Sequence, residues 1–506
     1  MRGGAAAPHT DPRPDRARAL LHPKPPPTRG MCTRVATPAS RGVTRVRQLC
    51  ADCAPIDPQA SWRRPEASAW AGTYDPAVED WTLTELDSGE RVISERLEHA
   101  RSVAVGYWIN AGSRDESDAK AGISHFIEHL LFKGTSRFSA LEIAEIFDGL
   151  GAELNASTSR ENTLLYSRVP AQHVAIALDV MGQMVFSPLF DELDAERDVV
   201  LEEIAMYEDS PQDLVHDLIA EAVFGSHALG RPVIGTAQVI STVPRRSINA
   251  YHRTMYSAPN VVVAAAGDID HDHLVALVAG AADARSAVTQ GKRTVRTPLV
   301  EIPQPALRFQ RKDTEQYHVC LGAPGISISD SRRFVASILD AVLGGSASSR
   351  LFQEIREKRG MAYSVYTFAS QYAETGQVGV YLGTREENVA DALAIAVEQI
   401  ADIAGGGLSP RELERAKENI KGRVLLSMES TSVHMNRLGK SLISDTEILS
   451  LEQVIAEVDA VEADAVCELA AVLLDPDRLS VAGIGPSEER FLEAVQRVTP
   501  ALARAA

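Results

Sequence analysis

Apolar and polar positions along the first half of the chain predict a hairpin followed by alternating helices and strands. Residues 82–96 (TLTELDSGERVISER) alternate on both sides of Asp87-Ser88-Gly89, which predicts two short antiparallel strands joined by a tight turn. A helix is predicted at residues 139–151, because Ser139 with Glu142 three residues later forms a capping-box pattern. The other predicted elements are strand-like segments at 102–112, 154–170 and 261–269, and helices at 122–134, 173–188, 194–209 and 271–281.

The second half repeats this rhythm after a segment rich in proline, threonine and charge at residues 286–305. We therefore predict an α+β fold of two tandem homologous α/β-sandwich-type domains, in which helices pack on sheets rich in antiparallel strands. The predicted domains span 76–285 and 306–500, with 286–305 as the linker. Within the second half, strands are predicted at 317–325, 362–370, 376–383 and 478–485, and helices at 331–344, 348–360, 387–404 and 409–429.

The charge of the chain restricts its binding partners. The 506 residues have a formal net charge of −18, although the first 70 carry eleven Arg and one Lys against four Asp and one Glu. The remaining chain is therefore even more acidic than the total, which excludes nucleic-acid binding through neutralisation of phosphates. Two interpretations of the acidity stay open: it keeps the protein soluble, or it attracts basic peptides by long-range electrostatics.

Residues 1–75 form an extension rich in Pro, Arg, Ala and Gly without a hydrophobic period. Such a segment buries too little apolar surface to offset the entropy of ordering it, so we predict that it is disordered. Three interpretations remain: a tail, a gene start placed too early with Met31 as an internal alternative, or an organellar transit peptide, since acidic residues are few. The proline run at 23–27 argues against an amphipathic targeting helix.

Membrane and compartment signals are weak. The sequence has no run of about 18 or more apolar residues, which predicts no membrane span, and its N-terminus lacks the apolar core of a secretory signal. Five cysteines, few and odd in number, suit a reducing compartment without structural disulfides. We expect a cytoplasmic protein, or one of an organellar matrix if the extension is a transit peptide. The cysteines are Cys32, Cys50, Cys53, Cys320 and Cys467.

His125, Glu128 and His129 form the first candidate site. Residues four apart on an α-helix lie about 40° apart around the axis, so His125 and His129 present two imidazoles to one ion. Glu128 projects beside that face, where bound zinc would give it a use: zinc lowers the pKa of its water to about 7, and a carboxylate accepts the proton. The alternative is that the two histidines only pack or face solvent, because an isolated H-x-x-E-H also arises by chance.

A third ligand is expected from a different element, because a catalytic zinc takes three protein ligands and leaves one position for water. The helix predicted at 194–209 offers several glutamates, of which Glu196 and Glu203 are two turns apart and share one face. Glu202 points about 100° away from Glu203. We predict that Glu203 is the ligand; the alternative is that these acids form a solvated face.

Together, the segment HFIEHLLFKGT that begins at His125 and the segment ERDVVLEE from Glu196 to Glu203 resemble the pitrilysin/insulinase family of zinc peptidases with an inverted HxxEH motif. The chain looks most like the processing-peptidase-like branch, and the resemblance runs from about residue 81 to about residue 485. Residues 151–163 (GAELNASTSRENT) and 349–365 (SRLFQEIREKRGMAYSV) also match. The resemblance implies one Zn²⁺ ion per chain, a catalytic first domain and an inactive, peptidase-like second domain.

The resemblance implies individual roles for the residues of the first site. His125, His129 and Glu203 would ligate zinc. Glu128 would be the general base, and Glu196 would support the site from a second acidic position.

Further residues match positions that hold substrate. Asn155 matches an edge strand on which the substrate backbone is laid by β-augmentation. Arg356 and Tyr363 match a pair in the second half that binds substrate and stabilises the oxyanion. The alternatives are an ordinary surface charge for Arg356 and a core aromatic for Tyr363. Asn162 departs from the pattern, since relatives often have His there.

The predicted function is that of a zinc-dependent endopeptidase acting on unfolded peptides or leader segments. Short members of the family pair two such chains, each half of a clamshell, around a chamber, so we expect a homodimer, with a heterodimer as the alternative. Two other functions stay open. One is a non-catalytic partner or scaffold subunit, although such subunits have a degraded metal motif. The other is a metal-dependent hydrolase of a small non-peptide molecule, which predicts a closed pocket.

Overall fold

The hairpin predicted at residues 82–96 is present. In the computed structural model, which describes residues 81–283, 292–296, 298–299, 301, 303–499 and 502, β1 (Trp81–Glu85) pairs antiparallel with β2 (Arg91–Arg96). Gly89 closes the turn at a φ of 105°, a left-handed conformation that glycine adopts without strain. The extension at 1–75, three of the cysteines and part of the predicted linker lie outside the described residues.

The first sheet has six strands in the order β1-β2-β6-β3-β5-β4. The strands β2 and β6 are parallel, and all other neighbours are antiparallel. The segment predicted as one strand-like stretch at 154–170 is in fact two strands, because the Ser159 hydroxyl accepts the N–H groups of Glu161 and Asn162 and closes a turn. The remaining strands are β3 (Ser102–Ile109), β4 (Glu153–Thr158), β5 (Thr163–Pro170) and β6 (Val261–Gly267).

The second sheet repeats the order of the first. Its sequence of neighbours is β7-β11-β8-β10-β9, with β7 and β11 parallel and the others antiparallel. This matches β2-β6-β3-β5-β4 strand for strand, so β9 is an edge strand as β4 is. The mixed fold of two tandem domains predicted from the sequence is thereby confirmed. The strands are β7 (Leu307–Arg311), β8 (Tyr317–Gly325), β9 (Ala362–Gln371), β10 (Gly376–Thr384) and β11 (Ser480–Gly485).

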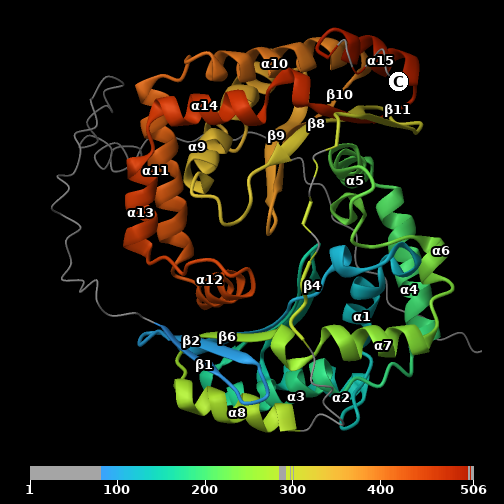
Figure 1. Cartoon of the computed structure of the whole chain (residues 1–506), viewed down its shortest axis with the longest axis vertical. Coiled ribbons are helices and arrows are strands. Elements are labelled where there is room, and N and C mark those ends of the chain that lie inside the picture. The colour runs from blue at the N-terminus through green and yellow to red at the C-terminus, as the bar shows by residue number, and fades with distance from the viewer. Residues whose placement is uncertain are drawn as a thin grey trace, which may run out of the picture. The chain divides into compact units, whose positions relative to one another are not determined.

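Helices lie in the longer connections between these strands and after β11 (Figure 1). In the first half they are α1 (Ile123–Leu131), α2 (Ala140–Leu150), α3 (Val174–Phe186), α4 (Leu193–Glu208), α5 (Pro211–Phe224), α6 (Ala237–Ile240), α7 (Arg245–Met255) and α8 (His271–Asp283). In the second half they are α9 (Arg333–Leu343), α10 (Val389–Ala404), α11 (Pro410–Ser427), α12 (Thr431–Ile443), α13 (Leu451–Ala460), α14 (Ala463–Leu473) and α15 (Glu488–Gln496). Short helical turns are η2 (Ser113–Asp115), η3 (Asp118–Lys120), η4 (Ala171–His173), η5 (Ala228–Gly230), η6 (Ala258–Asn260), η8 (Glu386–Asn388) and η9 (Pro476–Arg478), and η7 (Phe352–Glu357) is π-helical. No helix in the described ranges is both long and apolar enough to cross a membrane.

Each sheet is covered on one face by helices of its own half and on the other by a helix from the opposite half. In the first sheet, Trp108 and Val262 of β3 and β6 pack against Met435 and Leu438 of α12. In the second sheet, Cys320 and Ile484 of β8 and β11 pack against Ile219 and Val223 of α5. Figure 1 shows α12 beside β6 and α5 beside β8 and β11. The two halves therefore exchange one helix each.

Polar contacts join α12 to the first sheet at the edge of this apolar interface. Glu95 of β2 is 4% exposed, and its two carboxylate oxygens lie 2.8 Å from His434 Nδ1 and 2.8 Å from an Arg437 guanidinium nitrogen. The His434 Nε2 atom lies 2.8 Å from the Met428 carbonyl oxygen. A buried carboxylate with two cationic partners keeps its charge compensated.

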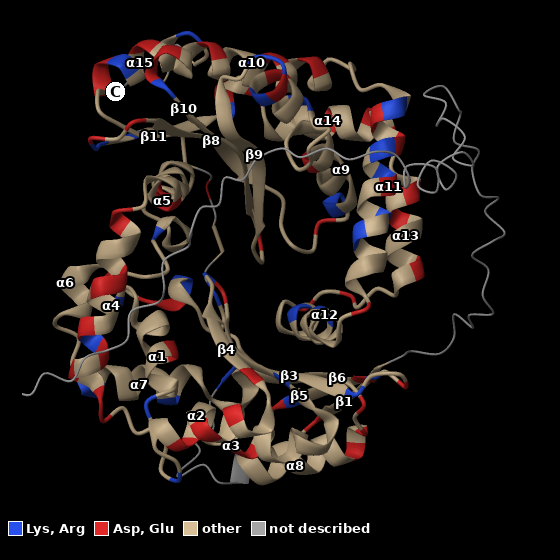
Figure 2. Cartoon of the chain, turned by 180° about the vertical axis from the view of Figure 1, so that it is seen from behind, with Lys and Arg blue, Asp and Glu red and all other residues tan. Residues whose placement is uncertain are grey.

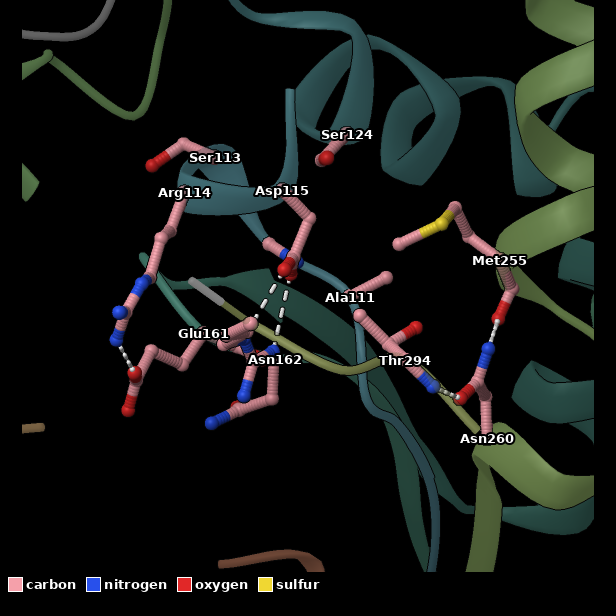
Figure 3. Close-up of polar contacts among 12 residues, drawn as sticks. Ala111, Ser113, Arg114, Asp115, Ser124, Glu161, Asn162, Met255, Asn260 and Thr294 are labelled. Carbon is pink, nitrogen blue, oxygen red and sulfur yellow. Dashed lines mark hydrogen bonds and ion pairs between the residues drawn. The ribbon is translucent and has the colours of Figure 1, made fainter. Parts of the chain in front are cut away.

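A second set of contacts holds the turn that follows β4 (Figure 3). The Arg114 guanidinium pairs with Glu161 in that turn and with Glu374 in the turn between β9 and β10. Nearby, the N–H of Thr294, in the segment predicted as the linker, donates to the Asn260 side-chain oxygen at 2.7 Å. The turns that end the two edge hairpins are therefore joined through one buried arginine.

Candidate metal centre

The helix that carries the two histidines is anchored at its start by Glu116. The Glu116 carboxylate accepts the N–H groups of Gly122 and Ser124 at 2.7 Å each, which satisfies donors left open at the first turn of α1. Gly122 has a φ of 92°, and a Cβ there would lie 2.6 Å from the Ile234 carbonyl oxygen, so only glycine fits. Burial raises the pKa of Glu116 to about 7, although its hydrogen bonds oppose the shift.

His125, His129 and Glu203 converge from two helices. The Glu203 Oε2 atom lies 3.2 Å from His129 Nε2 and 3.7 Å from His125 Nε2. The two imidazole rings have centroids 4.7 Å apart, as expected for residues one helical turn apart. In the described part of the chain, these three residues form the one group of three or more His, Cys, Asp or Glu side chains close enough to share an ion.

The donor set fits zinc. Bonds of about 2.0–2.1 Å in a tetrahedral arrangement separate neighbouring ligand atoms by roughly 3.3 Å, and the observed 3.2 and 3.7 Å lie on either side of that value. Glu203 Oε2 is buried and has no hydrogen-bond partner among the described residues. Since an unpaired buried carboxylate oxygen is costly, a cation at this point would compensate it.

His125 is held in the form that binds a metal. Burial, together with the neighbouring His129, lowers the pKa of His125 to about 4. The ring is therefore neutral at physiological pH and has a lone pair available for coordination.

Glu196 contacts His129 from the side opposite Glu203. Its Oε1 lies 2.9 Å from His129 Nδ1, and its Oε2 lies 2.6 Å from Lys133 Nζ. Glu196 is 4% exposed, so it lies within the buried apolar face of α4 and does not face solvent. This contact orients the ring, which is the usual task of a carboxylate behind a ligating histidine.

Glu128 lies next to this cluster and contacts the edge strand. The Thr158 hydroxyl at the end of β4 donates a hydrogen bond to Glu128 Oε2. Burial raises the pKa of Glu128, while the Thr158 hydrogen bond and the charge of His129 oppose that shift. A half-buried carboxylate with a raised pKa is a suitable proton acceptor near neutral pH.

The structure places Asn155 on β4, at the edge of the six-stranded sheet. Its side chain is exposed and its Oδ1 accepts the N–H of Ala156 at 2.8 Å. The outer side of β4 has no strand neighbour in the described sheet, so its backbone groups are free to pair with an extended peptide.

Arg356 and Tyr363 contact each other in the second half. The Arg356 guanidinium carbon lies 4.6 Å from the centroid of the Tyr363 ring, a cation–π contact. Tyr363 is 78% exposed, so it is not the core aromatic considered as an alternative. In the described ranges, no hydrogen bond or ion pair joins either side chain to the His125, His129 and Glu203 cluster.

Three side chains that support the site were not predicted from the sequence. Lys133 had a usable signal, because it lies four residues after His129 and would share its helical face. Thr158 had a weaker one, its position in the strand-like stretch after Asn155. Glu116 had none, because its role depends on a loop folding back onto the start of α1.

Comparisons with known proteins place these features in a family. A family model described as insulinase (peptidase family M16) matches residues 91–237, and one described as peptidase M16 inactive domain matches residues 242–420. An uncharacterized zinc protease of Streptomyces coelicolor is 41% identical over 420 residues, covering 80% of this chain and 90% of that protein. The uncharacterized zinc protease YmxG of Bacillus subtilis is 40% identical over 404 residues, covering 79% of this chain and 97% of that protein.

Solved structures show the same fold at lower identity. A structure described as the peptidase M16 inactive domain from Pseudomonas fluorescens has a TM-score of 0.75 at 22% identity, covering 81% of this chain and 98% of that one. A protease from Helicobacter pylori also has a TM-score of 0.75, at 21% identity, covering 80% of this chain and 99% of that one.

Proposed function

The chain belongs to the insulinase family, peptidase family M16, a family of zinc metalloproteases, and we propose that it is an endopeptidase that cleaves unfolded peptides or leader segments. The observation that carries this proposal is the convergence of His125, His129 and Glu203, with Glu203 Oε2 buried and without a hydrogen-bond partner among the described residues. We assign these three side chains as the ligands of one zinc ion.

Zinc bound there would act as a Lewis acid on the scissile carbonyl. It would also lower the pKa of a water molecule, which would then lose its proton more easily and attack that carbonyl. Glu128 then accepts the proton of the attacking water and delivers it to the leaving amine nitrogen. The raised pKa of Glu128 suits both steps, since the group must accept and release a proton within one turnover. Thr158 holds one Glu128 oxygen, so the other is free for this transfer.

The substrate backbone is proposed to pair with the outer edge of β4 near Asn155. Backbone pairing is tolerant of sequence, which suits a peptidase acting on unfolded chains. Arg356 and Tyr363 are proposed to bind substrate and to stabilise the oxyanion, which requires the exposed Tyr363 ring to meet the substrate. The proposed catalytic domain is 76–285 and the proposed inactive domain is 306–500. A homodimer is the proposed assembly.

The test is incubation of the purified chain with a mixed library of unstructured peptides, with and without a chelator, and identification of the cut sites by mass spectrometry. Internal cleavage that the chelator abolishes and added zinc restores is the expected result. A zinc-loaded chain that leaves every peptide intact would instead identify a non-catalytic subunit. Release of single terminal residues only would overturn the endopeptidase assignment.

A further inference from the structure

A cavity of about 910 Å³ lies between the two halves of residues 81–499 and includes none of the residues of the candidate metal centre. Its wall is formed by the turn after β4, by the end of β9, and by the helices α9, α11 and α12. These elements come from both halves, so the cavity exists only in the complete fold.

Three basic side chains on three different helices line this cavity. They are Arg333 of α9, Arg423 of α11 and Lys440 of α12. Arg423 and Lys440 are exposed, and none of the three forms an ion pair with another described residue. Figure 2 shows Lys and Arg positions on α11 and α12.

The acidic side chains of the wall leave much of this charge uncompensated. Glu161 is paired with the buried Arg114, which lies outside the cavity wall. Arg160 lies 3.5 Å from Asp217, so it is also compensated. The remaining acidic side chain of the wall is Asp340, which accepts a hydrogen bond from Thr367 and interacts electrostatically with Arg423. The cavity is therefore locally positive in a chain whose net charge is −18.

The cavity adjoins the end of β4, where the edge strand contacts Glu128, the proposed catalytic base. Thr158, the last residue of β4, donates to Glu128, and the next residues, Ser159 to Asn162, line the cavity. An extended peptide advances about 3.3 Å per residue. A peptide lying along β4 beside Glu128 would therefore reach the cavity within a few residues of the bond to be cleaved.

We propose that Arg333, Arg423 and Lys440 form a binding site for an acidic segment of the peptide substrate, a few residues from the scissile bond on one flank. This inference rests on the proposed peptidase function and adds a substrate preference to it. The preference is the opposite of the one that the overall acidity of the chain suggests. Salt screens the interaction of a bound peptide with distant charges of the chain more than its interaction with the nearby cations of the cavity. The cavity cations therefore decide the selectivity.

The experiment measures binding by fluorescence anisotropy with the full chain in a chelator, so that no cleavage occurs. The labelled peptides share one sequence and differ only in a central run of Glu, Gln or Lys. We expect the Glu peptide to bind about tenfold more tightly than the Gln peptide, as three partly exposed ion pairs would give, and the Lys peptide to bind most weakly. The difference should shrink at high salt.

Variants identify the site. The combined variant Arg333→Gln, Arg423→Gln, Lys440→Gln is expected to bind the Glu and Gln peptides equally. The matched control Arg411→Gln removes an exposed cation of the same helix α11 that does not line the cavity, and it should keep the preference. Lys440→Arg, which retains the charge, should also keep it. Equal binding of the two peptides by the parent chain would overturn the proposal, as would a preference that survives the combined variant.

The outcome separates this inference from the proposed function. If the chain prefers the Glu peptide but cleaves no peptide when loaded with zinc, the result contradicts the peptidase assignment and supports the binding of acidic segments. A chain that cleaves peptides without any acidic preference would do the reverse.

Discussion

His129 Nδ1 and Glu196 Oε1 lie 2.9 Å apart, so the imidazole nitrogen that faces away from Glu203 is held by a carboxylate two turns earlier on the same helix as Glu203. Glu196 is held in turn by Lys133 at 2.6 Å. A hydrogen bond of this kind sets the tautomer of the ring, which leaves Nε2 with its lone pair toward the proposed zinc position.

Removal of the Glu196 carboxylate should weaken zinc binding without removing a ligand. We expect Glu196→Ala to raise the Kd for zinc by about 10- to 100-fold, because the His129 ring loses its orientation. Competition with a chelating dye measures this constant. Glu202→Ala, which removes an exposed carboxylate from the same helix, is the matched control and should bind zinc as the parent does. Equal constants for the two variants would show that Glu196 has no role at the metal.

Substitutions of Glu128 and His129 should distinguish the loss of peptide hydrolysis from the loss of metal binding. Glu128→Gln keeps the three proposed ligands and removes the proposed proton acceptor, so it should retain zinc and lose at least about 100-fold in kcat. His129→Ala should lose both zinc and activity. Elemental analysis and a quenched-peptide assay on the same samples measure the two properties. Cleavage by the Gln variant at the parent rate would show that the base is another group.

The sequence predicted the features that depend on helical geometry. His125 and His129 share a face because they are four residues apart, and Glu196 and Glu203 share one because they are seven apart. The structure brings all four together across α1 and α4. The ligand and base roles remain predictions, since they require bound metal and a measured reaction.

The sequence could not predict contacts made by distant segments. Glu116 reaches the start of α1 from a loop, and Arg114 joins turns from opposite halves, and neither contact has a periodic signal. The strand-like stretch at 154–170 was predicted without its turn, because Ser159 closes that turn through its side chain rather than through glycine or proline. The basic cavity was also missed, because its three cations lie on three separate helices.

The Thr158 hydrogen bond to Glu128 should be visible in the pH profile. Burial raises the pKa of Glu128 and the Thr158 hydroxyl partly offsets that shift, so Thr158→Val should raise the pKa further. A general base works only when deprotonated, and activity therefore falls as pH drops through its pKa. We expect the acid limb of kcat/KM to lie at higher pH in Thr158→Val than in the parent. Thr158→Ser, which keeps the hydroxyl, should follow the parent, and superimposable limbs for Val and parent would contradict this account.

Gly439 allows α12 to approach the first sheet. A Cβ at this position would lie 2.0 Å from Trp108 Nε1, inside a buried contact. Gly439→Ala should therefore lower the free energy of unfolding by about 1–3 kcal/mol, measured by urea denaturation. Gly422→Ala in α11 is the control, because a Cβ there meets nothing within 4 Å and a helical alanine is favoured over glycine. A stabilised Gly439→Ala variant would show that the helix is less tightly docked.

The contact between His434 and Glu95 should make stability depend on pH. Burial alone would lower the pKa of His434, but the hydrogen bond and charge of Glu95 raise it above the usual value. A group with a raised pKa in the folded chain stabilises the fold fully below its unfolded pKa, about 6.5, and loses that contribution as pH rises through the folded pKa. The Tm difference between the parent and His434→Gln should therefore be greatest near about pH 6 and decrease at alkaline pH. A difference independent of pH over that range would mean that His434 is neutral in the contact.

The exchange of α5 and α12 limits how the chain can be divided. A cut at 286–305 would leave Trp108 and Val262 uncovered on one fragment and Cys320 and Ile484 uncovered on the other. Large apolar faces of this kind lead to precipitation, so each fragment alone should aggregate, whereas the two produced together should reassemble. Two halves that cover each other in this way become independent proteins only when each acquires a replacement for the helix it takes from the other.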